Sequence, residues 1–276
     1  MFNNEDVLNA AHNARATFEV AKRAVSLIDL TSLNDDDTSE TIAALCQRAR
    51  TPVGPVAAVC VYPRFIAQAA AALDWSGIKV ATVVNFPAGD ASINSVQRDT
   101  RLALDSGAHE IDVVLPYRAY LDGNRQQAMA LLEAVCSLCH EGARVRAKVK
   151  VILETGRLND SAIILAASQD AIGAGVDFLK TSTGKVEINA TLEACVAMLR
   201  AIDENIERGG RTVGLKASGG LRSTLDAARY LALIDEAMGE HWATPATFRF
   251  GASSLLDSLL TTLDTKYGKP AETRGY

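Results

Sequence analysis

The chain has 276 residues, of which 48% are hydrophobic and 22% charged, and its formal net charge is -5 at pH 7. This size and composition suit an ordinary globular protein with ample core, built as one large domain or two small ones. The acidic balance argues against a general nucleic-acid binder, which would carry a basic face, but it leaves room for a local site for a small anion.

Neither a membrane span nor an export signal is evident in the sequence. No apolar run approaches the ~18–20 residues that a spanning helix needs, and residues 1–6 are polar and acidic rather than signal-like. The five cysteines are odd in number and lie in apolar contexts, so we expect reduced core residues. The stretch 136–140 matches a Cys-x-x-Cys-His haem-attachment pattern, but it lies in a helical apolar pattern and is interpreted as structural. We therefore expect a cytoplasmic protein with no membrane partner.

The chain begins with helical spacing and then alternates between two patterns. Residues 6–25 show helical spacing of their apolar positions, which predicts an N-terminal helical extension. We assign this extension to residues 1–24. Eight short apolar strands follow, at 25–30, 56–61, 80–86, 111–115, 148–154, 178–181, 213–217 and 248–251. Amphipathic helical stretches separate them, at 38–50, 64–73, 93–106, 124–140, 160–174, 189–206 and 223–238, with a last helix at 255–267. Residues 266–276 are polar and predict a mobile tail.

This alternation predicts βαβ units and a parallel sheet. The strands are nearly continuous apolar runs, which indicates that helices cover them. Eight such units in about 250 residues match a closed (β/α)8 TIM barrel, here a single domain over 1–276. An open doubly wound sheet is the alternative, although Gly-x-Gly-x-x-Gly is absent after the first strand.

Two lysines interrupt apolar strands, Lys180 in 178–181 and Lys216 in 213–217. Lysine is rarely buried unless it is paired or functional, and desolvation lowers its pKa toward the nucleophilic amine. Neighbouring strands would bring the two ammonium groups together, so that each lowers the pKa of the other. Asp112, in strand 111–115, is a buried carboxylate that needs a partner. One such residue alone is more often structural, but together they favour iminium chemistry on a carbonyl compound.

In a barrel the active site forms at the C-terminal ends of the strands. Besides these three residues, that filter selects Asp29, Cys60, Asn85 and Glu154, and Lys150 shares the parity of Glu154. The glycine- and serine-containing turns 219–222 and 251–254 follow the last two strands, where barrels commonly bind phosphate. The four histidines are scattered away from these ends, so no metal site is expected.

From residue 27 onward the sequence resembles the deoxyribose-phosphate aldolases. The motifs that carry the resemblance are LIDLT (27–31), NDDDT (34–38), VYPRF (61–65), NFP (85–87), EIDVV (110–114), ETG (154–156), FLKTSTGK (178–185), KASGG (216–220) and FGASSLL (250–256). The resemblance implies a class I aldolase without metal or cofactor. Such an enzyme reversibly cleaves 2-deoxyribose 5-phosphate to acetaldehyde and glyceraldehyde 3-phosphate in deoxyribose catabolism.

The resemblance also implies roles for individual residues. Lys180 would form the Schiff base, Lys216 would tune it, Asp112 would move protons with water, and the terminal Tyr276 would assist proton transfer at the acetaldehyde carbon. The residues expected to bind substrate or its phosphate are Asp29, Cys60, Thr183, Gly184, Lys185, Gly219, Gly220, Ser253 and Ser254. A homodimer is the expected assembly.

Two other functions stay open at this stage. One is a different Schiff-base barrel, such as a transaldolase or a keto-acid aldolase, whose pocket would accept a ketone or carboxylate donor. The other is a phosphate-binding barrel without catalysis, for which the two lysines and Asp112 would have no evident purpose.

Overall fold

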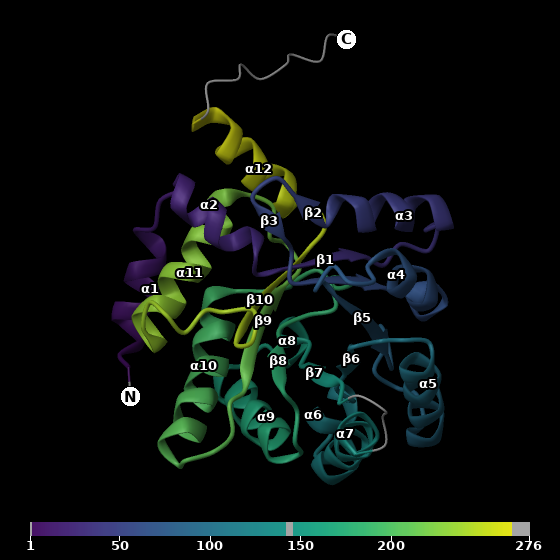
Figure 1. Ribbon diagram of the computed structural model, residues 1–276. Coiled ribbons are helices and arrows are strands. Elements are labelled where there is room, and N and C mark those ends of the chain that lie inside the picture. Colours follow the sequence, from purple (N-terminus) through teal and green to yellow (C-terminus); the bar gives the residue numbers. More distant parts are fainter. Residues whose placement is uncertain (1, 142–145, 267–276) are drawn as a thin grey trace.

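Eight parallel strands close into a barrel in the computed structural model, which describes residues 2–141 and 146–266 (Figure 1). Around the barrel each strand pairs with the next, and the last pairs with the first. The strands are β1 (Ile28–Ser32), β4 (Ala58–Val61), β5 (Lys79–Val84), β6 (Glu110–Val114), β7 (Lys148–Ile152), β8 (Phe178–Lys180), β9 (Gly214–Ser218) and β10 (Phe248–Ala252). The predicted (β/α)8 barrel is confirmed, with each strand within a few residues of its predicted position.

Helices follow the strands and cover the barrel (Figure 1). They are α3 (Ser39–Arg48), α4 (Ile66–Ala72), α5 (Ile93–Asp105), α7 (Arg125–His140), α9 (Ser161–Gly173), α10 (Leu192–Glu207), α11 (Thr224–Met238) and α12 (Leu255–Lys266). Side-chain caps fix several of their starts: Thr38 begins α3 and Ser223 begins α11, each in a reciprocal capping box.

Some elements escaped prediction because they are too short to show a period. They are the small hairpin of β2 (Arg50–Thr51) and β3 (Gly54–Pro55), the 3₁₀ turn η1 (Pro63–Phe65), and the short helices α6 (Tyr117–Leu121) and α8 (Thr155–Leu158).

The N-terminal extension is two helices, α1 (Asn4–His12) and α2 (Phe18–Val25), where the sequence predicted one continuous stretch. Thr17 accepts a hydrogen bond from the backbone N–H of Val20 and starts α2 anew. The helices pack on α10, α11 and α12. At the other end, α12 includes Lys266, where the predicted helix 255–267 and the predicted tail 266–276 overlapped. The remaining predicted tail, 267–276, lies outside the described residues.

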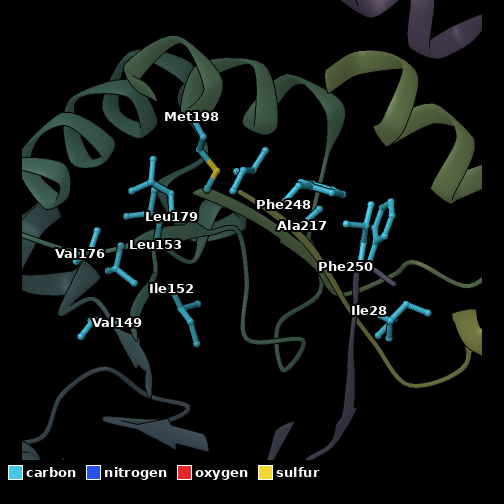
Figure 2. Close-up of a cluster of buried hydrophobic side chains, with 14 of the residues drawn as sticks. Ile28, Val149, Ile152, Leu153, Val176, Leu179, Met198, Ala217, Phe248 and Phe250 are labelled. Carbon is cyan, nitrogen blue, oxygen red and sulfur yellow. The ribbon is translucent and has the colours of Figure 1, made fainter. Parts of the chain in front are cut away.

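The hydrophobic core lies between the strands and the helices. In Figure 2, Met198 of α10 points toward the strands that carry Leu179, Phe248 and Phe250. Because side chains alternate along a strand, these outward apolar residues leave the intervening positions facing the barrel interior. Charged residues fill several of those positions, including Lys180 next to Leu179 and Arg249 between the two phenylalanines, and both are almost fully buried.

The remaining sequence features have structural explanations. Cys136 and Cys139 are buried in α7, and Nε2 of the adjoining His140 lies 2.8 Å from an Asp177 carboxylate oxygen. This stretch therefore anchors its helix to the loop before β8. None of the helices in the described ranges is long and apolar enough to cross a membrane.

Gly214 at the start of β9 offers a test of interior packing. A Cβ there would collide with the ring of Phe178, so we expect Gly214→Ala to lower the free energy of unfolding by about 1–3 kcal/mol in a urea titration. The matched control is Gly173→Ala at the end of α9, where a Cβ meets nothing within 4 Å and stability should hold or rise. Equal stability of the two variants would contradict this packing.

Candidate active site

A cavity of about 290 Å³ opens at the C-terminal ends of β1, β8, β9 and β10. Many of the predicted site residues line it together: Lys180, Thr183, Gly184, Lys185, Gly219, Gly220, Ser253 and Ser254. The cavity thus joins the proposed nucleophile to the proposed phosphate loops. It also has walls that the prediction left out, formed by Thr31, Leu33, Asn34, Ser218, Leu221, Arg222, Gly251 and Ala252. Of these, Leu221, Arg222, Gly251 and Ala252 belong to the turns 219–222 and 251–254 that the sequence indicated, whereas Leu33 lies outside every quoted motif.

Lys180 ends β8 and is 3% exposed. Its Nζ donates to Oδ2 of Asp112 at 2.8 Å, across the barrel interior from β6. The Nζ of Lys216 donates to the same oxygen at 2.8 Å, and β8 and β9 align the two lysines as register partners. The two lysines therefore lie side by side as predicted, and Asp112, whose partner the sequence left open, accepts directly from both.

A second layer of charge lies beneath these residues. Lys150 of β7 donates to Oδ1 of Asp112 at 2.9 Å and lies 2.5 Å from a Glu110 carboxylate oxygen. Asp29 accepts from Lys216 at 2.6 Å and from Arg249 at 2.5 Å, and Arg249 also donates to Glu110 at 2.9 Å. The parity of strand β7 correctly indicated an inward Lys150. The roles of Glu110 and Arg249 were missed, because partners on distant strands are not visible in a linear pattern.

The buried cluster holds more cationic than anionic groups. Four basic side chains face three carboxylates: Lys150, Lys180, Lys216 and Arg249 against Asp29, Glu110 and Asp112. An uncompensated charge in a dry interior is costly, so the cluster balances when one basic group is neutral. Arginine stays protonated in proteins, which leaves a lysine to lose its proton.

Within this cluster, Lys180 is the lysine whose pKa falls. Burial lowers the pKa of its ammonium and the charge of Lys216 lowers it further, while Asp112 opposes both. For Lys216, burial alone would lower the pKa, but Asp112 and Asp29 outweigh burial and raise it. Burial would raise the pKa of Asp112, yet Lys150, Lys180 and Lys216 hold it well below the ordinary value. Lys180 is therefore the available amine, and Lys216 and Asp112 stay charged.

Two residues predicted to contact substrate lie below the cavity instead. Asp29 is fully buried under Lys216 and Arg249, and Cys60 is fully buried with a thiol pKa raised by burial. Neither lines the cavity. Asp29 is the second residue of β1, because the strand runs from Ile28 to Ser32 and not over 25–30 as predicted. Cys60 packs with Leu33, Ala81 and Val83 in a small apolar cluster. The predicted Tyr276 lies outside the described residues.

A buried carboxylate organises the loop after β8. Glu154 follows β7 in the left-handed conformation (φ 57°); its Oε2 accepts from the Thr183 hydroxyl at 2.5 Å, and its Oε1 accepts from the Thr183 backbone N–H at 3.2 Å. Lys185, two residues on, then reaches across the cavity mouth, where its Nζ donates to the Leu33 carbonyl at 2.7 Å. This connection holds Lys185 at the edge of the site.

Because Gly251 of β10 has no side chain, the side chain of Lys216 can occupy the space beside it. A Cβ at Gly251 would lie 2.8 Å from Cε of Lys216 and 2.6 Å from Cβ of Ser218, well inside normal contact. Glycine is therefore needed here for the lysine to pass into the cluster.

We expect Lys216→Met to raise the pKa of Lys180, because the substitution removes a nearby positive charge that lowers that pKa. Fewer Lys180 side chains would be neutral at a given pH. The fraction of Lys180 that acetic anhydride acetylates can be measured by mass spectrometry as a function of pH. In this variant the rise of that fraction should occur at a higher pH than in the wild type.

Lys148→Met is the matched control. It removes a half-buried lysine at the start of the same barrel's β7, so the acetylation profile of Lys180 should not move. A Lys216→Met profile that coincides with the wild type would contradict the coupling.

Known proteins are similar to this chain in sequence and fold. The DeoC/LacD family aldolase model matches residues 23–261. A candidate deoxyribose-phosphate aldolase from Toxoplasma gondii is 25% identical with a TM-score of 0.81, covering 90% of this chain and 95% of that one. A candidate of the same name from Coccidioides immitis is 26% identical with a TM-score of 0.74, covering 94% and 98%.

A third similar structure is a deoxyribose phosphate aldolase from Aeropyrum pernix, described as tetrameric. It is 25% identical with a TM-score of 0.69, and the match covers 96% of this chain and 98% of that one. The family match spans the whole barrel, including the lysine cluster and the cavity loops. The chain therefore belongs to the DeoC/LacD family of aldolases.

Proposed function

We propose that this protein is a class I deoxyribose-phosphate aldolase, which reversibly cleaves 2-deoxyribose 5-phosphate to acetaldehyde and glyceraldehyde 3-phosphate. The observation that carries the proposal is Lys180: a buried lysine of lowered pKa that borders a cavity also lined by glycine, serine and lysine loops. The cavity thus combines a nucleophilic amine with groups that suit a phosphate.

The amine of Lys180 attacks C1 of the open-chain sugar, and loss of water gives an iminium ion. Removal of the proton from the C3 hydroxyl lets the C2–C3 bond break, and its electron pair flows into the iminium to form an enamine. Glyceraldehyde 3-phosphate leaves. Protonation of the enamine at C2 and hydrolysis of the resulting iminium then release acetaldehyde and restore the amine.

Asp112 and Lys216 serve the proton transfers in this scheme. Asp112 is fully buried and does not line the cavity, so its carboxylate takes up the C3 proton through a water, and Lys216 balances its charge from 2.8 Å. Because Lys216 keeps a raised pKa, its ammonium also favours the neutral form of Lys180. We propose Tyr276 as a further proton-transfer group at the acetaldehyde carbon, on the basis of the family resemblance alone.

The phosphate end of the substrate fits the opposite side of the cavity. Gly219 and Gly220 both have positive φ, 86° and 81°, and such glycine turns can direct backbone N–H groups at an anion. Ser253 and Ser254 precede the twelve-residue helix α12, whose first N–H groups favour an anion. Lys185 adds a positive charge at the rim.

We also propose a cytoplasmic homodimer. The five cysteines are free and buried, which suits a reducing compartment. The Aeropyrum pernix relative is described as tetrameric, which supports self-association without fixing the number of copies, and sedimentation equilibrium would measure it.

Trapping with borohydride tests the Schiff base. After incubation with 2-deoxyribose 5-phosphate and reduction, we expect one reduced adduct, on Lys180, in the digested protein. Lys180→Ala should lose both the adduct and detectable cleavage, because no other amine in the cluster combines a lowered pKa with access to the cavity.

Lys148→Ala is the control, and it should retain the adduct and the activity. An adduct on another lysine, or cleavage by Lys180→Ala near the wild-type rate, would contradict the assignment.

Lys185→Met tests the phosphate end. Loss of one charge-assisted hydrogen bond, worth roughly 1.5–3 kcal/mol, should raise KM for 2-deoxyribose 5-phosphate by about tenfold or more. Turnover of unphosphorylated 2-deoxyribose should hardly change. If cleavage of 2-deoxyribose 5-phosphate and of 2-deoxyribose is impaired equally, Lys185 acts only through its bond to Leu33 and not on the phosphate.

A further inference from the structure

Thr181 follows Lys180 directly in the chain, is fully buried, and does not line the active-site cavity. Its backbone N–H donates to the Lys216 carbonyl at 3.1 Å, and its backbone carbonyl accepts from the Thr155 N–H at 2.9 Å. Both backbone groups of this residue are therefore used, one toward β9 and one toward the start of α8. The catalytic scheme above gives Thr181 no role.

The Thr181 hydroxyl makes two further hydrogen bonds, both to the backbone of Ser218. Its Oγ1 donates to the Ser218 carbonyl at 3.1 Å and accepts from the Ser218 N–H at 3.0 Å. In a regular parallel ladder that N–H would bond to the Thr181 carbonyl, because Lys180 and Lys216 are register partners. The carbonyl is already bonded to Thr155. The hydroxyl thus replaces one backbone bond just beyond the end of β8.

Ser218 extends this contact to the phosphate turn. It is the last residue of β9, it lines the cavity, and Gly219 and Gly220 follow it. Its own hydroxyl donates to the Ser182 carbonyl at 2.6 Å, which is a second link between the same two loops. We call the bonds that Thr181 and Ser218 make through their hydroxyls the hydroxyl brace. Both residues are buried, so water competes little for these bonds.

The hydroxyl brace joins the two ends of the active site. Lys180, which would bind C1 of the sugar, immediately precedes Thr181 in the chain. The turn 219–220, which would hold the phosphate at the other end of the same carbon chain, immediately follows Ser218. A sugar phosphate reacts only when its length matches this separation, and a displacement of about 1 Å can lower a rate by about a hundredfold.

We propose that Thr181 is a positioning residue that fixes the separation between the Lys180 amine and the turn 219–220, and thereby selects aldose phosphates of five carbons over those of six. The inference rests on the proposed function, because it assigns the two ends of the site to C1 and to the phosphate. Thr181 acts through Ser218 and does not contact the substrate. Loss of its hydroxyl leaves the buried Ser218 N–H without a partner, so the turn is free to move relative to Lys180.

Kinetics with two substrates test this selection. Cleavage of 2-deoxyglucose 6-phosphate would give acetaldehyde and erythrose 4-phosphate. The ratio of kcat/KM for 2-deoxyribose 5-phosphate to that for 2-deoxyglucose 6-phosphate therefore measures discrimination by chain length. Thr181→Val should lower this ratio by about tenfold, the effect of losing one hydrogen bond. Thr181→Ser, which keeps the hydroxyl, should restore it.

Thr82→Val is the matched control. The Thr82 hydroxyl is buried in β5 and donates to the Val61 carbonyl at 2.7 Å, and neither residue lines the cavity. Both valine variants should unfold at a lower urea concentration than the wild type, but only Thr181→Val should change the kcat/KM ratio. A wild-type ratio in Thr181→Val, or an equal change in both variants, would overturn the proposal.

Thr181→Cys replaces Thr181→Val if the valine variant does not fold. A thiol is a weak donor and acceptor, so the kcat/KM ratio should fall, although by less than tenfold. A wild-type ratio in a folded Thr181→Cys protein would count against the proposal in the same way.

A trapping experiment separates this inference from the proposed function. Borohydride would fix ribose 5-phosphate or glucose 6-phosphate on Lys180 without any C–C cleavage. Thr181→Val should lower the ratio of pentose to hexose adduct relative to the wild type, a comparison in which the open-chain fractions of the two sugars cancel. If that ratio falls but the chain does not cleave 2-deoxyribose 5-phosphate, the proposed function fails and the inference stands. An unchanged ratio, or no adduct on Lys180 from either sugar, overturns the inference.

Discussion

The structure depends on how the barrel interior balances its buried charges. Asp112 accepts hydrogen bonds from Lys150, Lys180 and Lys216, and all four side chains are almost fully removed from water. Removing one partner from such a cluster leaves another charge exposed to a medium that cannot solvate it. The positions of β6, β7, β8 and β9 are thereby tied to a single carboxylate.

That arrangement explains why the reactive group is an amine. The cluster carries one more basic group than carboxylates, and Lys180 is the member at the cavity, where a neutral side chain costs the network least. Lys150 and Arg249 lie deeper and keep their protons, because burial works against them but Asp112, Asp29 and Glu110 outweigh it and raise the pKa of each. The pKa of Lys180 thus depends on its burial and on the charges of Asp112 and Lys216, which lie behind it in the cluster.

The fold tolerates this polar barrel interior because its apolar contacts lie between the strands and the surrounding helices. Alternation along the strands directs Leu179, Phe248 and Phe250 outward to the helices, and this layer forms the continuous core (Figure 2). The barrel can then use its inward positions for chemistry. The loops follow the same division of labour: Glu154, buried behind Thr183, positions the cavity edge without lining it.

Several features could be read from the sequence because they are local. The apolar runs predicted the eight strands, and the glycine turns after β9 and β10, which were predicted to bind phosphate, line the same cavity as Lys180. Lys180, Lys216 and Asp112 stood out because a charged residue inside an apolar strand needs a reason. The family motifs then supplied the chemistry.

Other features needed the tertiary structure because they depend on distances between strands. The sequence predicted that Asp29 ends its strand, but β1 begins at Ile28, so Asp29 lies at the start of the strand and beneath the cavity. The partnership of Glu110 with Arg249 joins strands 139 residues apart, and nothing local encodes it. The bonds of the Thr181 hydroxyl to Ser218 likewise became visible only once β8 and β9 were paired. Residue type and periodicity determined which groups the barrel holds, and packing decided which of them meet.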